Sequence, residues 1–401
     1  MQLLLFLLNI LLYSVGVFLL LNCLYLLFFA VAGHFLKRLP RAVGTPAGLR
    51  RMGVLIPAYK ADDVILDTAR AALRHKYDGF FEVVVIADGL LNSTIEALGQ
   101  VGAKVVTVSF ERSTKGKALL HTLQTLPPAA FDIAVVLDAD NLMAKGCLAD
   151  INAAFAAGYR VVQAHRTALN QDTAFALLDA CNEEINNHIY RQGPFALGLS
   201  SALIGSGMAF EYGYLQQLLT GIGETVGEDK ELDFRIARDQ VKVGYLGDTY
   251  VYDEKIDNAQ VFTQQRTRWL ASQLEFLKKY AGEGITQLFR FGNVEFFNKA
   301  VQTFLVPRTL LIGVLGVFFL LSLLVPAGPP AEFWGGLLLL LAGTLLLALP
   351  ARMYTAQLLQ AVVRLPYAIG CMCLALLRMN RTKTSFLATP HKARVPSTTL
   401  D

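Results

Sequence analysis

The chain has 401 residues, of which 54% are hydrophobic and only 17% are charged, and its formal net charge is +4. This composition is too apolar for one ordinary soluble domain and is typical of a membrane protein with a soluble part. The small positive excess gives no reason to expect nucleic acid as a partner, so the placement of the charges matters more than their number.

The first predicted element is an N-terminal transmembrane helix over residues 1–36. Residues 3–36 contain no Asp, Glu, Lys or Arg, and this run is far longer than the apolar core of a signal peptide. The basic residues that follow it are Lys37, Arg38, Arg41, Arg50 and Arg51. Because basic residues gather on the cytoplasmic side, we expect the N-terminus outside and the next domain in the cytoplasm, at the inner (plasma) membrane.

Between residues 50 and 281, short apolar runs alternate with helical patterns. Predicted strands cover residues 54–57, 81–87, 105–108 and 133–137, and predicted helices cover residues 63–73 and 117–126. Strands this apolar, separated by helices, indicate an α/β fold whose mostly parallel sheet is covered on both faces. Ligands of such sheets bind beyond the carboxyl ends of the strands, so Asp88, Asp138 and Asp140 are expected to face one crevice.

Two carboxylates one residue apart, Asp138 and Asp140, follow the strand at 133–137. Their oxygens suit Mg²⁺ or Mn²⁺, and these ions suit a diphosphate, so the pair predicts a metal site for a nucleotide sugar. An ordinary turn or helix cap is the alternative. Lys115 and Lys117 flank a glycine at a helix start, which favours close approach to phosphate, with solvated charges as the alternative.

Two glycine-containing segments carry further candidates. Gly207 lies in the sequence Gly-Ser-Gly-Met-Ala at 205–209, where small residues permit close backbone approach to a substrate or form a simple turn. Asp229 follows Gly227 and Glu228 and is a candidate general base, because inversion at an anomeric carbon needs a carboxylate to deprotonate the acceptor hydroxyl. The alternative is an acidic helix start that interacts with the helix dipole.

The residues Gln265, Arg268 and Trp269 are spaced i, i+3 and i+4, so they share one face of a helix. The Arg268 guanidinium can bind a phosphate in a fork, and Trp269 offers a flat apolar face for a sugar ring. The alternative is an amphipathic helix that packs Trp269 into the core.

The C-terminal third predicts membrane-associated helices. Residues 282–302 indicate an interfacial helix with aromatic residues on one side, for which a plain core helix is the alternative. Residues 303–349 predict two transmembrane helices joined by a turn at 326–330. Residues 350–401 predict an amphipathic interfacial segment and a basic cytoplasmic tail, with a further span as the alternative. The five cysteines form no Cys-x-x-Cys pair and indicate reduced thiols.

With these residues in place, the chain resembles the membrane-integrated, inverting family 2 glycosyltransferases, which include cellulose, hyaluronan, chitin and poly-N-acetylglucosamine synthases and the ceramide glucosyltransferases. The resemblance covers nearly the whole chain. It rests on the strand at 54–59, Asp88, Asp138-Ala139-Asp140, Glu228-Asp229, the QxxRW motif at 265–269 and the tail segment at 386–390. The chain departs from the family where Lys60-Ala61-Asp62 replaces Asn-Glu and where Gly227 replaces Thr.

The resemblance implies a GT-A domain over residues 50–281 that binds Mg²⁺ or Mn²⁺ through Asp138 and Asp140. It implies a nucleotide-sugar donor, preferably a UDP-sugar, that contacts Asp62, Asp88, Lys117, Asp138 and Arg268. It implies a saccharide or lipid acceptor that contacts Glu228, Gln265, Trp269 and Gly207, with Asp229 as the base. Membrane lipids would surround the helices, and a polymer product would call for a secretion or co-synthase protein partner.

Three functions remain open at this point. One is a polymer synthase for the cell envelope or an exopolysaccharide. The second is a single-sugar glycolipid synthase, acting on ceramide or diacylglycerol, which the small number of predicted spans favours. The third is a degenerate nucleotide-sugar-binding membrane scaffold, motivated by the departure at 60–61.

Overall fold

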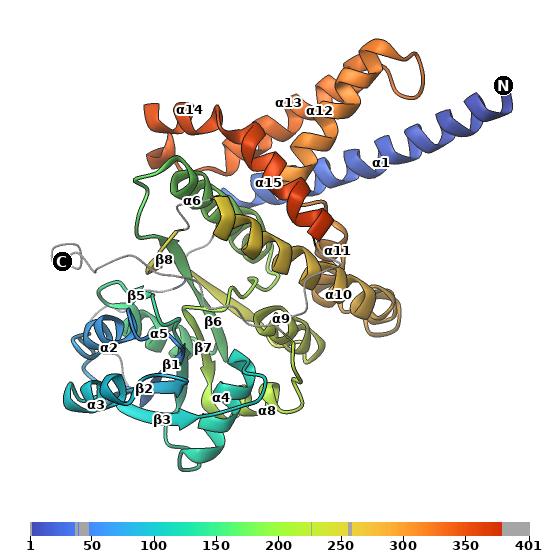
Figure 1. The fold of residues 1–401 in the computed structure, drawn as a ribbon. Helices are drawn as coiled ribbons and strands as arrows, with labels where there is room; N and C mark the ends of the chain where they lie inside the picture. The colour runs from blue at the N-terminus through green and yellow to red at the C-terminus, as the bar shows by residue number, and fades with distance from the viewer. Residues whose placement is uncertain (1, 37–38, 40–47, 226, 256–258, 379–401) are drawn as a thin grey trace.

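The computed structural model describes residues 2–36, 39, 48–225, 227–255 and 259–378. A mixed sheet and its covering helices form one part, at the bottom of Figure 1, and apolar helices from both ends of the chain form the other, at the top. The predicted basic residues 37, 38 and 41 and the tail segment 386–390 lie outside the described residues.

The sheet has eight strands in the order β3-β2-β1-β4-β7-β6-β8-β5. Strands β1 to β4 are parallel, β7 is antiparallel to both of its neighbours, and β6 and β8 are parallel. The predicted α/β fold with a mostly parallel sheet is confirmed, and all four predicted strands are present. The strands are β1 Met52–Tyr59, β2 Phe81–Asp88, β3 Lys104–Val108, β4 Ile133–Val136, β5 Leu142–Met143, β6 Val161–Ala168, β7 Met208–Glu211 and β8 Val243–Asp253.

Both faces of the sheet are buried, which explains why the strands read as continuous apolar runs. In β1, Val54 and Ile56 belong to a core formed with α2 and α5, whereas Leu55 belongs to a core formed with α4, α8 and α9. A strand that is covered on both faces needs apolar side chains at successive positions. The covering helices are α2 Ile65–Leu73, α3 Asn92–Gln100, α4 Lys115–Thr125, α5 Cys147–Ala156, α8 Tyr212–Leu219 and α9 Glu228–Arg238.

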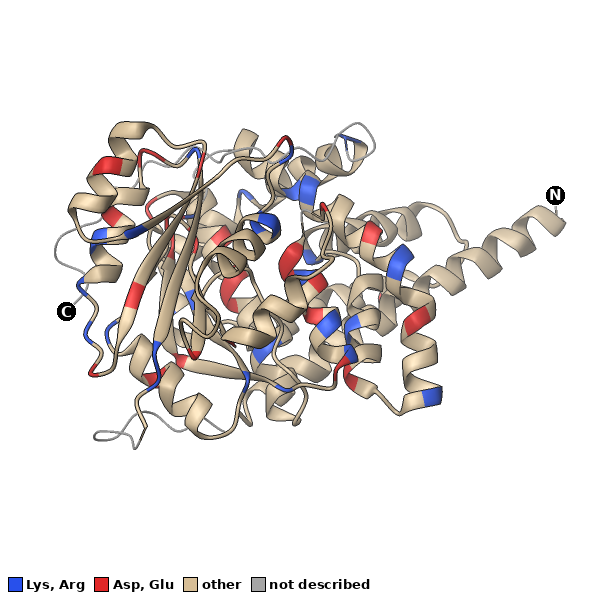
Figure 2. Ribbon diagram, turned by 90° about the horizontal axis from the view of Figure 1, so that it is seen from below, with Lys and Arg blue, Asp and Glu red and all other residues tan. Residues whose placement is uncertain are grey.

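The helical part is built around α1, residues Gln2–Gly33, which packs against α13, the short α7 and the π-helix η1. Its projecting end carries no Lys, Arg, Asp or Glu (Figure 2). The remaining elements are α6 Ala174–Asn186, η1 Asn187–Gln192, α7 Gly193–Ala196, α10 Ala259–Phe291, α11 Val294–Phe304, α12 Arg308–Leu324, α13 Ala331–Ala348, η2 Ala351–Met353, α14 Ala356–Val362 and α15 Leu365–Arg378.

Among the described residues, α1 and α13 are long and apolar enough to cross a membrane. Two further spans are available if each bent pair counts as one, α11 with α12, bent by 53°, and α14 with α15, bent by 48°. This is compatible with a membrane location. In its described part, the predicted amphipathic segment after residue 350 consists of the 3₁₀-helix η2 and the two helices α14 and α15.

The predicted interfacial helix at 282–302 does not exist as one element, and the predicted boundary at 281 falls inside α10, a helix of 33 residues. The break comes at Gly292 and Asn293. Gly292 adopts a left-handed conformation with φ of +63°, and the Asn293 side chain caps α11 by accepting from the Phe296 amide. Phe296 is fully buried against the aromatic rings of α9 and α10, as the core-helix alternative predicts for this stretch.

Gly193 offers a test of the contact between the two parts. A Cβ atom on Gly193 would lie 2.4 Å from the carbonyl oxygen of Phe29 on α1. Because that neighbour is backbone, we expect Gly193→Ala to lower the free energy of unfolding by about 1–3 kcal/mol, measured by thermal unfolding in detergent. Gly213→Ala on α8 is the matched control, since its Cβ would meet no such neighbour within 4 Å. Equal unfolding midpoints for the two variants would contradict this packing.

Candidate active site

A cavity of about 870 Å³ opens at the carboxyl ends of β1, β2 and β4. The sheet contributes acidic side chains to its wall, α9 contributes its first turn, and α10 covers it from the side of the apolar helices. The lining residues with chemistry of interest are Asp88, Lys115, Asp138, Asp140, Arg166, Arg191, Glu228, Asp229, Lys230, Asp253, Lys255, Gln265, Arg268 and Trp269.

Asp138 directly follows β4, and its backbone amide donates to the Ser206 hydroxyl at 3.0 Å, which fixes the turn. Its carboxylate binds the ammonium of Lys115, which also donates to the Gly205 carbonyl at 2.6 Å and lies 3.9 Å from Glu228. The Lys115 side chain is 11% exposed, so its charge is almost fully committed to this cavity. Lys115 therefore ties the β4 end to the α9 start through one buried cation.

Asp140 lies deeper in the wall, where burial, then the negative charges of Asp253 and Asp138, raise its pKa well above the usual value. Asn141 bridges two of these acids, donating to Asp140 at 3.1 Å and to Asp253 at 2.8 Å. Within the described part of the chain, no three His, Cys, Asp or Glu side chains gather as a complete metal cage. Two carboxylates that repel each other fit a divalent ion that takes its other ligands from a diphosphate and water.

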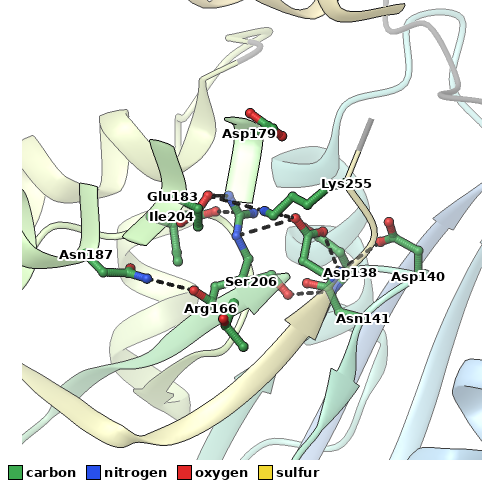
Figure 3. Close-up of polar contacts among 12 residues, drawn as sticks. Asp138, Asp140, Asn141, Arg166, Asp179, Glu183, Asn187, Ile204, Ser206 and Lys255 are labelled. Atoms are coloured by element: carbon green, nitrogen blue, oxygen red, sulfur yellow. Dashed lines mark hydrogen bonds and ion pairs between the residues drawn. The ribbon is translucent and has the colours of Figure 1, made fainter. Parts of the chain in front are cut away.

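A buried ion-pair network lies beside these acids (Figure 3). Arg166 of β6 pairs with Glu183 of α6 at 2.9 Å and approaches Asp253 of β8 at 3.9 Å. Lys255 joins the same two acids, at 2.7 Å from Asp253 and 3.5 Å from Glu183. Burial opposes ionisation of Glu183, but Arg166, Lys255 and Arg191 together hold its pKa far below the usual value. The network fixes β6, β8 and α6 around the cavity.

Glu228 and Asp229 form the first turn of α9 and both face the cavity. Burial raises the pKa of Glu228 to about 7, with the Lys115 charge opposing and the Asp229 charge adding to the shift. Burial also raises the pKa of Asp229, although its Oδ1 accepts from the Lys230 amide at 2.8 Å. A carboxylate with a raised pKa is a stronger base once ionised, which suits proton removal from a hydroxyl.

Gln265, Arg268 and Trp269 all line the cavity from α10. Trp269 is 44% exposed, so it is not packed into the core, as the alternative would require. The Arg266 guanidinium lies 4.1 Å from the Trp269 ring centre and is itself paired with Asp179. This cation holds the indole from one side by a cation–π contact, and the ring remains available to the cavity.

A family model described as "Glycosyltransferase like family 2" matches residues 50–272, more than half of the chain. The chain belongs to this family of glycosyltransferases. No protein with a curated description matches it. The match ends within α10, just after Trp269, so the acidic residues of the sheet, α9 and the 265–269 face all lie inside the glycosyltransferase domain.

Among solved structures, the transferase is similar to mannosyltransferase PcManGT from Pyrobaculum calidifontis, which was solved with GDP-Man and Mn²⁺. The TM-score is 0.52 at 17% identity, and the match covers 92% of this chain and 99% of that one. It is also similar to glucosyl-3-phosphoglycerate synthase from Mycobacterium tuberculosis, at 19% identity, a TM-score of 0.35 and coverage of 59% and 87%. The first likeness shows that the fold is shared over 92% of this chain.

Three of the residues predicted to bind substrate do not line the cavity. Asp62 accepts from the Leu91 amide at 2.9 Å and so supports the loop after β2. The Lys117 ammonium donates to Glu224 at 2.7 Å, on the outer side of α4. Gly207 belongs to the backbone pairing of the sheet, and a Cβ there would lie 3.0 Å from Val251. Their near neighbours Lys60, Lys115 and Gly205 line the wall instead.

The other predicted site residues all line the cavity, namely Asp88, Asp138, Asp140, Glu228, Asp229, Gln265, Arg268 and Trp269. Sequence reasoning missed Asp253 and Lys255, which line the cavity, and Glu183, which supports its wall. Asp253 ends β8, so the strand-end rule that singled out Asp88 and Asp138 would also have found Asp253 if β8 had been recognised.

The two lysines of α4 lead to opposite expectations. Lys115→Met should lower kcat/KM for the nucleotide-sugar donor by about 100-fold or more, because it removes a preorganised charge from the cavity. Lys117→Met should lower it by less than about fivefold, because it removes only a partly exposed ion pair. Steady-state release of nucleoside diphosphate measures both. A larger loss for Lys117→Met would restore the sequence-based assignment of Lys117 to the donor.

Proposed function

We propose that this family 2 glycosyltransferase is a membrane-bound, inverting enzyme. It moves a sugar from a nucleotide-diphosphate sugar, preferably a UDP-sugar, to a saccharide or lipid acceptor. The reaction takes place at the cytoplasmic membrane face and serves cell-envelope or exopolysaccharide synthesis. One observation carries the proposal. A single cavity is lined by Asp138 and Asp140, by the candidate base Asp229 and by the Gln265–Trp269 face, and its wall also includes the break between α11 and α12.

The donor would occupy the part of the cavity between Asp88 and the Asp138–Asp140 pair. Asp88 is 6% exposed at the end of β2, where it can accept from the nucleoside. Asp138 and Asp140 would hold Mg²⁺ or Mn²⁺, which would neutralise charge on the leaving diphosphate. The presence of Mn²⁺ with GDP-Man in the mannosyltransferase of similar fold supports this arrangement. Lys115 and Arg268 would add positive charge on the same group.

Asp229 would remove the proton from the acceptor hydroxyl while that oxygen forms a bond to the anomeric carbon. The bond from this carbon to the diphosphate oxygen breaks at the opposite side, and its electron pair leaves with the nucleoside diphosphate. Configuration at the anomeric carbon inverts. Trp269 would hold the acceptor sugar or headgroup against its exposed face, and Gln265 and Glu228 would contact its hydroxyls.

A single-sugar glycolipid synthase is the second candidate. The wall of the cavity includes Leu305, Val306 and Pro307, the apolar break between α11 and α12, which brings the reacting centre close to helices suited to lipid. The scaffold alternative is opposed by Asp138, Asp140, Asp229, Arg268 and Trp269, which all line the cavity. The test is incubation with a panel of nucleotide sugars, with Mn²⁺ or with EDTA, followed by sizing and lipid extraction of the product. A product of many sizes indicates a polymer synthase, a single lipid-soluble product indicates a glycolipid synthase, and no product indicates a scaffold.

Asp229→Asn tests the assignment of the base. The amide preserves the shape of the side chain but cannot accept a proton, so we expect kcat to fall by about 100-fold to 10,000-fold. Nucleotide affinity, measured by calorimetry in detergent, should stay the same. A variant that turned over at the wild-type rate would show that another group removes the proton.

The raised pKa of Asp229 leads to a prediction for the pH dependence. Only the ionised carboxylate accepts a proton, so the rate should fall as the pH drops through this raised pKa, about tenfold per pH unit. The acid limb of the kcat/KM profile should therefore lie above the ordinary aspartate value of about 4. A profile that stayed flat down to about pH 4 would contradict the assignment.

A further inference from the structure

The cavity has two ends of different chemistry. At the sheet end, Asp88, Asp138 and Asp140 surround the site proposed for the donor. At the opposite end, the wall is formed by Gln302 and Thr303 of α11 and by the break at 305–307. Asp229 belongs to the first turn of α9, and the next residue, Lys230, also faces the cavity.

Lys230 brings a charge into the cavity that the protein itself does not pair. Its ammonium makes no hydrogen bond or ion pair with any residue in the described ranges, whereas two other lysines of the cavity wall, Lys115 and Lys255, have carboxylate partners. Burial lowers the pKa of Lys230, and the positive charges of Lys299 and Arg191 lower it further against the opposing Asp233 and Asp229. A cation in such a place is stabilised by an anionic ligand.

Arg191 of η1 is a second cation in the cavity wall whose guanidinium is only partly hydrogen-bonded. Its side chain is only 7% exposed. One nitrogen donates to Asn187 at 2.8 Å and lies 3.6 Å from Glu183, but its buried Nε has no partner among the described residues. Glu183 is already shared with Arg166 and Lys255, so it compensates Arg191 only in part.

Asp233, whose negative charge acts on both cations, is engaged through one of its two oxygens. Asp233 pairs with Lys299 at 3.1 Å, and the same oxygen accepts from the Leu203 amide at 3.1 Å. Asp233 is fully buried, and its ion pair joins α9 to α11. Lys230 and Arg191 are therefore cations of the cavity wall with capacity left for a ligand, and the second oxygen of Asp233 has no hydrogen-bond partner among the described residues.

The same end of the cavity lies beside a buried apolar cluster. Val306, in the cavity wall, packs against a cluster formed by α10, α12 and α15, which contains Phe262, Leu270, Leu310, Cys371, Met372 and Ala375. On the outer side of these helices, Leu320 is 61% exposed, Tyr367 59% and Leu377 77%. A ligand with a charged head at Lys230 and an apolar tail along α12 and α15 would match both features.

We propose that the acceptor is an anionic lipid, and that Lys230 and Arg191 bind a phosphate of its headgroup beside the hydroxyl that Asp229 deprotonates. This inference rests on the proposed function and adds the class of acceptor to it. The phosphate is not consumed. It fixes the headgroup so that its hydroxyl lies between Asp229 and the anomeric carbon, and charge-assisted hydrogen bonds from Lys230 and Arg191 provide the orientation.

The test uses the full-length protein in vesicles with the donor that it accepts. Three acceptor probes are compared: phosphatidylglycerol, which has a phosphodiester and free hydroxyls, diacylglycerol, which has a hydroxyl without phosphate, and soluble glycerol 3-phosphate. We expect transfer to phosphatidylglycerol to exceed transfer to the other two by roughly tenfold or more. Preference for glycerol 3-phosphate would keep the anion site but overturn the lipid, and preference for diacylglycerol would overturn the proposal.

Lys230→Gln should lower kcat/KM for phosphatidylglycerol by roughly tenfold or more. Hydrolysis of the donor without an acceptor should fall much less than transfer does, because water needs no phosphate contact and the change acts on it only through the pKa of Asp229. Lys230→Arg should restore most of the loss. Lys278→Gln, at an exposed position on α10 away from the cavity, removes the same charge and is the matched control. Equal loss of donor hydrolysis and of transfer would place Lys230 at the donor and overturn the proposal.

Phosphatidic acid provides a measurement on the wild-type protein alone. It carries the phosphate but no headgroup hydroxyl, so it should inhibit transfer competitively with phosphatidylglycerol and leave donor hydrolysis unaffected. Absence of such inhibition would contradict the phosphate site, whereas absence of donor hydrolysis with every nucleotide sugar would contradict the proposed function itself.

Discussion

The constraint on which this structure depends is the convergence of carboxylates in one buried cavity. Asp138, Asp140 and Asp253 come from strand ends, and Glu228 and Asp229 come from the start of α9. Burial and mutual repulsion oppose their ionisation, as the raised pKa values of Asp140 and Glu228 show. The chain compensates with Lys115, Arg166 and Lys255, each from a different element. Loss of one such cation leaves a buried charge without a partner, so the cations that prepare the site also hold the strands and helices in place.

The same kind of pairing connects the catalytic domain to the apolar helices, and α6 is the element that carries it. Glu183 on α6 pairs with Arg166 in the cavity wall, whereas its neighbour Glu184 accepts from Arg352, which follows α13, at 2.7 Å. Arg308 at the start of α12 donates to Asn182 and Asn186, also on α6. A shift of α12 or α13 would therefore move the helix that supports the cavity. The position of the reacting centre relative to the apolar helices is fixed by these polar contacts as well as by apolar packing.

The sequence was sufficient for the strands, the acidic pair and the 265–269 face, because each depends on local spacing. The sequence was insufficient where the assignment depends on which of two nearby residues faces the cavity. Lys115 and Lys117 are two residues apart on a helix, about 200° around its axis, so only one can face the cavity. Of Gly205 and Gly207, only Gly205 lines the cavity, because the backbone of Gly207 is hydrogen-bonded within the sheet. The Arg166–Glu183–Lys255 network joins residues from three distant segments, and no spacing within one segment predicts it. The single helix α10 was missed because its polar and aromatic stretches look like different elements.

The break between α11 and α12 shows how a polar cavity can reach the apolar helices. A bend of 53° interrupts the backbone hydrogen bonds of these helices, and unpaired backbone groups are costly in an apolar environment. Here other helices supply the partners. Asn22 of α1 accepts from the Val306 amide at 2.8 Å, and the Gln273 amide of α10 donates to the carbonyls of Thr303 and Leu305 at 3.1 and 2.7 Å. Because side chains of two packed helices satisfy the break, it is a built feature of the fold. The buried Asn22 of the uncharged N-terminal helix is thereby explained. Through Asn22, α1 positions the part of the cavity wall that Val306 contributes.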